Sequence, residues 1–245
     1  MSITVNLSYV AVAVCLVLWF PATAQGGGFE TRTLSLKKDV DVVLIDSTFN
    51  SRFNVFISID PEYPNDRNRV ELTAPADAIA DDEPLVEQRG KTLLMESLFP
   101  IGMAIERAVV VKIFLGRLKY FKSVGANTVR IFGLNEEVFE CLLDGTGTVL
   151  LIGNAKSASI SIKGKLRVDA SEFRAEVLQI YANDYTRSLV RPIRQIEAVA
   201  KKFAEIYYLR VPEAERLFGT FGGGFIKGVL APKEANLSEK EVRKR

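Results

Sequence analysis

The sequence of 245 residues contains no histidine. Without histidine there can be no Ser-His-Asp or Cys-His catalytic arrangement and no zinc site with imidazole ligands. Cysteine is nearly as scarce: only Cys15 and Cys141 occur, which excludes cysteine-rich zinc and iron–sulfur sites. The nucleotide-binding patterns G-x-x-x-x-G-K-[ST] and strand–G-x-G-x-x-G–helix are also missing. We therefore predict no catalytic residue, no metal and no cofactor, although carboxylate catalysis needs no histidine and is not excluded.

Charged residues are missing from the N-terminus, where residues 1–24 contain no Asp, Glu, Lys or Arg and the first charged side chain is Glu30. An apolar run over Val10–Phe20 ends at Pro21, and Ala22-Thr23-Ala24 follows as an A-x-A cleavage site. A short apolar run, a helix breaker and small residues at the cleavage site are typical of a secretory signal peptide. We expect residues 1–24 to be removed and the protein to be exported to the periplasm, the outer surface or the medium.

An uncleaved membrane anchor is the alternative, because the apolar stretch from Ser8 reaches about 17 residues, the short limit for spanning a bilayer. Membrane contact is expected only in that case. A lipoprotein is not expected, since Cys15 lies inside the apolar run. Cleavage leaves Cys141 alone, so no internal disulfide can form and burial must hold the fold together. The net charge of +2 gives no reason to expect a nucleic-acid partner.

The rest of the chain shows the alternation of β-structure. Phe53, Val55, Ile57 and Ile59 recur at every second position, which is typical of a half-buried strand. The expected organisation is a flexible glycine-rich leader over 25–32, an N-terminal β segment over 33–117, β-solenoid repeats over 118–231 and a charged, disordered tail over 232–245.

A repeat with an offset of twenty residues appears when Ser123–Gly133 is aligned with Leu143–Gly153. The identical pairs are Gly125/Gly145, Thr128/Thr148, Val129/Val149 and Gly133/Gly153. A fixed period of this length with alternating strands inside it indicates a solenoid of strands and tight turns, with glycine at corners that need positive φ or close backbone approach. An antiparallel sandwich with glycine-rich turns is the alternative. The residues expected to point inward are Phe139, Cys141, Leu143, Val149, Leu151, Ile160, Ile162, Leu166 and Val168.

Four parts of the chain resemble the head GIN domain family, named for auto-transporter adhesins of bacteria. Val40–Asp60 resembles its opening strands, and Gly125–Val129 and Gly145–Val149 resemble its repeated S-G-A-G-S-V element. Ala204–Pro212 resembles its V-x-Y-x-G-x-P signature, and Gly222–Ile226 its closing glycine-rich strand. The resemblance implies an all-β fold, namely a right-handed, single-stranded parallel β-helix or β-solenoid with N-terminal opening strands, and an adhesin-like role.

The sequence departs from that pattern at Asn127, at Arg210 and over Asp184–Glu197, where the repeat is most degraded. Broken packing rules of this kind often mark functional sites. Arginine and tyrosine there are well suited to exposed recognition, although a solvated face or a tyrosine ladder would have the same composition. The candidate binding residues are Arg187, Arg191, Arg194, Tyr181 and Tyr185.

A second candidate, the acidic group Asp77, Asp81, Asp82 and Glu83, could bind calcium but lacks a glycine-spaced ligand loop, so a solvated loop is favoured. The sequence thus predicts an exported, non-catalytic envelope or surface protein that is adhesin-like and either binds a ligand or is structural. Its partner would be an envelope or surface glycan, protein or anionic lipid. A carbohydrate-active β-helix enzyme that acts on polysaccharide is the alternative.

Overall fold

A computed structural model describes residues 28–37, 39–62, 68–75, 86–96, 109–219 and 222–229. These residues form strands and no α-helix, which confirms the all-β class. No helix in this part of the chain could cross a membrane. The predicted signal segment, the acidic residues Asp77, Asp81, Asp82 and Glu83, and the charged tail lie outside the described residues, so the expectations for them stay predictions.

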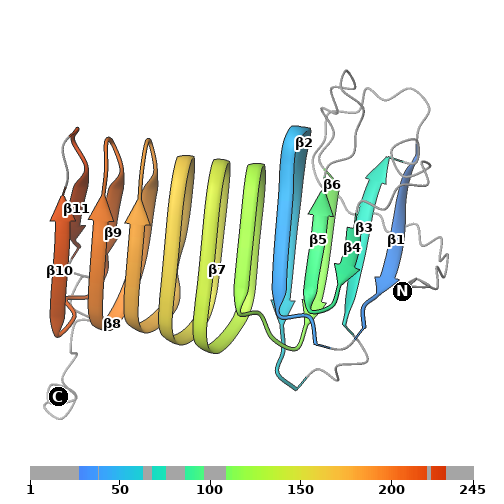
Figure 1. The fold of residues 1–245 in the computed structure, drawn as a ribbon, viewed down its shortest axis with the longest axis horizontal. Coiled ribbons are helices and arrows are strands. Elements are labelled where there is room, and N and C mark those ends of the chain that lie inside the picture. The colour runs from blue at the N-terminus through green and yellow to red at the C-terminus, as the bar shows by residue number, and fades with distance from the viewer. Residues whose placement is uncertain are drawn as a thin grey trace, which may run out of the picture.

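The strands belong to one open sheet, whose order runs from β1 through β3, β6, β2, β7, β8 and β9 to β11, with β4, β5 and β10 paired at its sides. Figure 1 shows this sheet extended along the long axis of the molecule. The strands are β1 (Phe29–Ser35), β2 (Val42–Ile59), β3 (Arg69–Pro75), β4 (Val86–Arg89), β5 (Thr92–Glu96), β6 (Val109–Leu115), β7 (Tyr120–Ala182), β8 (Arg187–Ala200), β9 (Glu205–Tyr208), β10 (Ala214–Gly219) and β11 (Phe225–Gly228).

The centre of the molecule is a stack formed by β2, β7 and β8. The 63 residues of β7 bend back repeatedly, and their successive passes lie side by side (Figure 1). We call each pass of the chain around the stack a rung. β2 pairs in parallel with the start of β7, with Val55 opposite Val129, and β8 pairs in parallel with its end, with Arg167 opposite Arg187. β2 therefore belongs to the stack, although the repeat is visible in the sequence only after residue 118.

The N-terminal end of the stack is not parallel throughout. β5 and β6 pair in parallel with the two halves of β2, but β4, β3 and β1 then join as antiparallel strands. The sheet is therefore mixed, with parallel pairing within the stack and antiparallel pairing among the strands at its N-terminal end. Of these antiparallel pairs, only β4 and β5 follow each other directly, through the turn at Gly90 and Lys91, as antiparallel strands can. β1 begins at Phe29, opposite Pro75, and so includes part of the segment expected as a leader.

The interior of the stack consists of residues at alternate positions. All nine side chains that the alternation predicts to point inward are buried, and Cys141 is only 2% exposed. Phe139 and Phe173 meet edge-on inside the stack, with ring centroids 5.8 Å apart. The phase of the strands in β7 was therefore predicted correctly from the period of two.

Glycines at the corners fix the register between rungs. Gly145 has a φ of 135°, and a Cβ at this residue would lie 2.1 Å from the carbonyl oxygen of Gly125. Gly147 has a φ of 126°, and its Cβ would lie 2.0 Å from the carbonyl oxygen of Asn127. Both contacts join residues twenty positions apart, as the sequence repeat predicts. That Val149 lies about 4.8 Å from Val129, the spacing of paired strands, stays a prediction.

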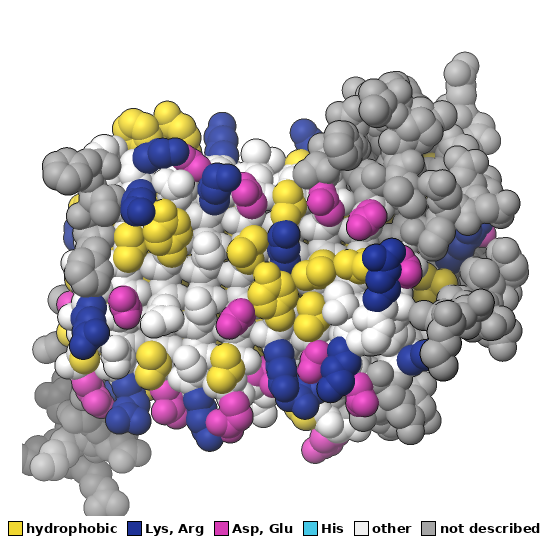
Figure 2. All heavy atoms as spheres, in the orientation of Figure 1, with side chains coloured by type: hydrophobic (Ala, Val, Ile, Leu, Met, Phe, Trp, Pro, Cys, Tyr) yellow, Lys and Arg dark blue, Asp and Glu magenta, His cyan; other side chains and the backbone are white. Residues whose placement is uncertain are grey.

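Charges of opposite sign line the same corner in successive rungs. The ammonium group of Lys163 donates to Asp144 Oδ2 at 3.1 Å, and that of Lys202 donates to Asp184 Oδ1. We call these four residues the corner charges. Acidic and basic side chains are interspersed along the upper edge of the stack in Figure 2, beside a group of hydrophobic side chains.

Candidate binding surface

The last rungs present a surface of basic and aromatic side chains. Parallel pairing brings Arg167, Arg187, Glu205 and Phe225 into one column and Asp169, Leu189, Tyr207 and Lys227 into the next. Alternate residues of a strand point to the same side, so each rung contributes every second side chain. We call the following set the basic-aromatic surface: Lys165, Arg167, Asp169, Tyr185, Arg187, Leu189, Phe203, Glu205, Tyr207, Phe225, Lys227 and Val229.

Earlier rungs share this character only in part. In the column that contains Arg167, Asn54 is opposite Thr128, and Thr148 occupies the repeat-equivalent position in the next rung. Two positions further along the strand, Phe56 is opposite Lys112 and Arg130, and the guanidinium carbon of Arg130 lies 5.0 Å from the centroid of the Phe56 ring. The last rungs therefore differ from the earlier ones in the column of Arg167, where long basic and aromatic side chains replace small polar ones.

The aromatic residues form ordered contacts while they stay open to solvent. Tyr185 and Phe203 stack with ring centroids 4.9 Å apart and an interplanar angle of 12°, although they are 65% and 55% exposed. Tyr207 and Phe225 meet at 5.9 Å and 60°. The guanidinium carbon of Arg187 lies 5.1 Å from the centroid of the Tyr207 ring. Exposed aromatic rings held in fixed positions suit recognition, because they offer a large contact area and lose little conformational freedom on binding.

A shallow pocket of about 240 Å³ lies within this surface. It is lined by Arg167, Val168, Asp169, Arg187, Ser188, Leu189, Tyr207 and Val229.

The two arginines of the pocket differ in their partners. The Nε of Arg187 lies 3.5 Å from Glu205 Oε2, which also accepts a hydrogen bond of 3.1 Å from the Tyr207 hydroxyl. Arg167 forms no ion pair within the described part of the chain. Asp169 Oδ1 accepts hydrogen bonds from the backbone N and the Oγ of Ser171, at 3.0 and 2.6 Å. The guanidinium of Arg167 is therefore available to an external anion.

The core beneath the pocket breaks the apolar rule of the stack. Strand pairing places Arg167 opposite Arg187 in the next rung. The inward residues on either side of Arg167 are apolar, namely Leu166 and Val168. Those on either side of Arg187 are polar, namely Thr186 and Ser188. Ser188 Oγ donates to the carbonyl oxygen of Glu205 at 3.2 Å, whereas the buried Oγ1 of Thr186 has no hydrogen-bond partner. Buried polar groups without a hydrogen-bond partner are uncommon because they destabilise the fold. The rung beneath Arg187 is therefore less stable than one with an apolar interior.

Only two of the five sequence-predicted binding residues belong to this surface, namely Arg187 and Tyr185. Beyond Ala170 the pairing of β7 with β8 shifts register, and the later part of β8 pairs with β10 instead of β9. Tyr181, Arg191 and Arg194 lie in this later part of the rungs.

These three residues have separate surroundings. Lys201 Nζ lies 5.0 Å from the centroid of the Tyr181 ring, and Arg191 is opposite Arg174. Arg194 lies 3.7 Å from a carboxylate oxygen of Glu176 and 3.9 Å from one of Glu213. Among the described residues, no strand pairing or ion pair links these three residues to the pocket, and their binding role stays a prediction.

Several members of the surface were not predicted from the sequence, notably Arg167, Phe203, Phe225 and Val229. The offset between paired residues is twenty from Arg167 to Arg187, eighteen from Arg187 to Glu205 and twenty again from Glu205 to Phe225. A fixed-period alignment therefore separates residues that the fold brings together. The available signal was the alternation of basic and aromatic residues around each of these strands.

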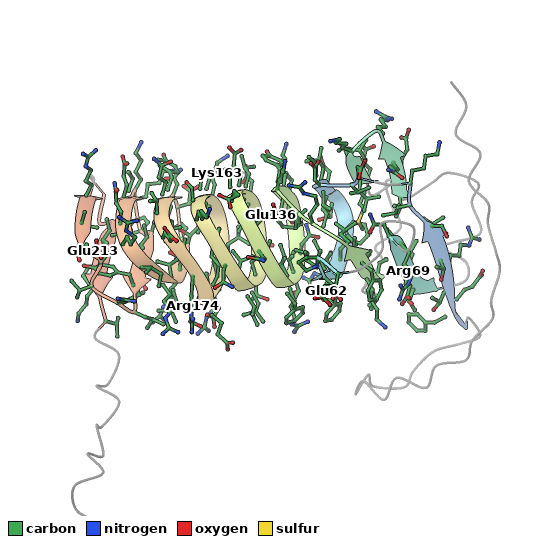
Figure 3. The ribbon with its side chains drawn as sticks, turned by 90° about the horizontal axis from the view of Figure 1, so that it is seen from below. Glu62, Arg69, Glu136, Lys163, Arg174 and Glu213 are labelled. Atoms are coloured by element: carbon green, nitrogen blue, oxygen red, sulfur yellow. The ribbon has the colours of Figure 1, made fainter. Side chains whose placement is uncertain are left out.

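Another broad face of the stack has a different composition. Figure 2 shows it to be mainly uncharged and polar, with hydrophobic and charged side chains scattered over it. Lys163 and Arg174 lie on opposite sides of the stack in Figure 3.

Within the described ranges, no three carboxylate or thiol side chains come together in a group that could hold a metal ion.

The sequence matches no known protein family, and no curated protein matches it. The structure is similar to a crystal structure from Bacteroides fragilis described as a putative adhesin, with a TM-score of 0.58 and 18% sequence identity over 82% of this chain and 97% of that one. Structures from Parabacteroides merdae and Parabacteroides distasonis, described as a putative adhesin and a putative lipid binding protein, give TM-scores of 0.41 and 0.43 at 13% and 15% identity. Each covers 82% of this chain, and 96% and 97% of its own chain, respectively. The similarity to the Bacteroides fragilis protein shows a shared fold.

Proposed function

We propose that this protein is an exported, non-catalytic surface protein that binds its ligand through the basic-aromatic surface. The observation that carries the proposal is the exposed Tyr185–Phe203 stack, which lies on the same surface as the pocket of Arg167 and Arg187. Aromatic and arginine side chains are the groups most enriched at sites that dominate binding energy. In the column of Arg167 these side chains follow the small polar residues Asn54, Thr128 and Thr148 of the earlier rungs.

The carboxylates of the surface favour binding over catalysis. Glycoside hydrolysis needs two carboxyl groups that flank the scissile bond, one of them able to donate a proton. Glu205 is instead paired with Arg187 and Tyr207, and Asp169 accepts two hydrogen bonds from Ser171. The polysaccharide-cleaving alternative therefore lacks support from this surface.

The proposal also includes the finer description of the architecture. The stack is a right-handed, single-stranded parallel β-helix of the head GIN type, to which antiparallel strands are added at the N-terminal end. Rung-to-rung contacts twenty residues apart support this description, and the resemblance in sequence motifs agrees with it. A rigid stack of this kind presents an extended face, as repeat proteins do. The name of the Bacteroides fragilis structure is in keeping with a role in adhesion.

A binding screen with aromatic variants tests the proposal. The purified protein is applied to an array of bacterial and host glycans, and the double variant Tyr185→Ala/Phe203→Ala is compared with Tyr181→Ala. Loss of two contacting rings should weaken binding about tenfold or more, since 1.4 kcal/mol corresponds to a factor of ten. Tyr181 lies on the later part of the rungs, outside the basic-aromatic surface, so the proposal requires its variant to bind normally. Weaker binding by Tyr181→Ala would instead favour the site predicted from the sequence. An array without any bound glycan, or equal binding by both variants, would contradict the proposal.

A further inference from the structure

The pocket between Arg167 and Arg187 brings two like charges next to each other. Paired strands place the two arginines directly opposite each other. Like charges opposite each other on a sheet are destabilising. Glu205 offsets one of the two charges, but the Arg167 guanidinium has no carboxylate partner among the described residues. An anionic group bound between the two would remove the repulsion.

We infer that this pocket binds the carboxylate or sulfate group of an acidic oligosaccharide, an inference that rests on the binding role proposed above. A guanidinium presents several N–H donors in a fixed plane and matches the geometry of such oxyanions. Arg187 uses its Nε toward Glu205, so its terminal nitrogens can donate to a ligand. Arg167 can offer its whole guanidinium.

The size and lining of the pocket fit one sugar unit. Its volume of about 240 Å³ is below the roughly 300–1,000 Å³ of pockets that enclose drug-sized ligands. It therefore accommodates one ring or one charged substituent, while the rest of a chain must lie on the open surface. Leu189, Val229 and the Tyr207 ring supply apolar contacts for the carbon-bearing face of a sugar.

The neighbouring aromatic rings provide a place for further sugar units. Tyr185 and Phe203 lie in the same rungs as Arg187 and Glu205, two positions before each of them. Both rings lie at the corner that leads into β8 and β9, directly after Asp184 and Lys202, which have positive φ. A chain held by its acidic group in the pocket can thus contact the exposed edges of this stack.

The mixture of charges distinguishes a glycan from a membrane. Segments that bind anionic lipid are clusters of basic residues, each contributing to attraction by the surface potential. Here Asp169 and Glu205 lie among Lys165, Arg167 and Arg187. Two carboxylates would be repelled by a layer of anionic headgroups, whereas hydroxyl groups of a sugar can bond to them. The surface therefore fits a ligand with separate acidic and hydroxyl groups.

Calorimetric titration of the full-length exported protein with defined probes tests this inference. The probes are an oligogalacturonate of about ten units, the same oligosaccharide with its carboxylates methyl-esterified, and a chondroitin sulfate oligosaccharide. Vesicles containing phosphatidylglycerol serve as the lipid probe. The variants are Arg167→Gln, Arg187→Gln and their combination, with Arg174→Gln as the matched control. Arg174 is also opposite an arginine, Arg191, but lies beyond the register shift that follows Ala170.

We expect at least one acidic oligosaccharide to bind and the methyl ester to bind at least tenfold more weakly. The double variant should lose tenfold or more in affinity, while Arg174→Gln keeps the wild-type affinity. A single cooperative melting transition shows that each variant is folded. Arg167→Lys should recover part of the loss, because lysine restores charge but not the forked geometry. Equal binding of acid and ester, or binding to vesicles without binding to either acidic oligosaccharide, would overturn the inference. If both acidic probes fail while the array finds a neutral glycan that depends on Tyr185 and Phe203, the inference fails and the proposed function stands.

Discussion

At the scale of single residues, Cys141 illustrates what the alternation of a strand can predict. It lies between the inward residues Phe139 and Leu143, and all three are buried. Burial raises the pKa of the Cys141 thiol far above its usual range. Because the thiolate is the reactive form, a buried thiol with a raised pKa should be inert.

We therefore predict that Cys141 in the exported protein reacts with a thiol reagent only after unfolding. Labelling by a chromogenic disulfide reagent should be slow in buffer and rapid in concentrated urea, and the difference should reflect the opening of the stack. The free thiol of a small peptide gives the reference rate. Fast labelling of the folded protein would mean that β7 opens locally far more often than its packing indicates.

Glycine at the corners is a second single-residue property, and Gly145 allows a sharp test. A methyl group there would lie 2.1 Å from the carbonyl oxygen of Gly125, on a backbone with a φ of 135°. We expect Gly145→Ala to lower the free energy of unfolding by about 3 kcal/mol, because it causes both backbone strain and overpacking. Gly90→Ala is the control, because that glycine has a φ of 60° but nothing within 4 Å of its added Cβ. Its cost should be about 1 kcal/mol. Urea denaturation measures both, and equal losses would refute the steric argument.

Asn127 shows what the sequence could not reveal at this scale. Its departure from the repeat glycine was visible, but its role depends on partners about 75 to 80 residues away in the chain. Its Oδ1 accepts from Ser47 Oγ at 2.8 Å and from Phe53 N at 3.3 Å, and its Nδ2 donates to Ser123 Oγ and to the carbonyl oxygen of Val124. The buried amide thereby ties β2 to the first turn of β7. Long-range pairing of this kind leaves no local pattern.

At the scale of strands and corners, the fold could be predicted where glycine marks the repeat. It could not be predicted where another residue takes the place of glycine. Gly125, Gly145 and Gly164 all have positive φ at one corner. In the next two rungs Asp184 and Lys202 take the same conformation, with φ of 65° and 56°. The geometry of the corner persists while its sequence marker disappears. This substitution, together with the change of offset, explains why the last rungs appeared degenerate and why the basic-aromatic surface was only partly identified.

The corner charges predict a pH-dependent contribution to stability. The hydrogen bond from Lys202 lowers the pKa of Asp184, and its charge and that of Lys163 lower the pKa further. A carboxyl group whose pKa is lower in the folded state stabilises the fold above its unfolded pKa, and this contribution is lost as the pH falls through the folded value. Asparagine tolerates the positive φ at this position, so Asp184→Asn removes the charge without new backbone strain.

We expect Asp184→Asn to lower the melting temperature at pH 7 and to lower it less at about pH 2, because the contribution of the carboxylate is lost as the pH falls through its folded pKa. Glu172→Gln is the control, since Glu172 is exposed and forms no ion pair in the described part of the chain. Its melting temperature should match the wild type at both values of pH. The same deficit for Asp184→Asn at pH 7 and pH 2 would show that the ion pair with Lys202 does not contribute.

At the scale of the whole molecule, the two ends of the stack differ. Antiparallel strands β1, β3 and β4 complete the N-terminal end, where a further parallel rung would otherwise be able to join. Such caps limit edge-to-edge association of sheets. The basic-aromatic surface lies towards the other end, on the later part of β7 and on β8, β9 and β11. A molecule attached near its N-terminus would hold this surface away from the point of attachment, which is the arrangement that an adhesin-like role requires.

Whether the N-terminus is attached or free depends on the predicted signal peptide. Cleavage after Ala24 would leave Gln25 as the first residue, shortly before β1 begins at Phe29. β1 pairs with β3 along its whole length from Phe29 to Ser35, so the proposed cleavage site lies outside the strand and processing need not disturb the cap. We predict that protein isolated from the native envelope has an intact mass corresponding to residues 25–245, as measured by mass spectrometry. A variant with Ala22→Leu and Ala24→Leu should retain residues 1–24, because the peptidase requires small side chains at these positions. If the wild-type mass already includes residues 1–24, the segment is a membrane anchor, and the stack is held at the bilayer by the end opposite its proposed binding surface.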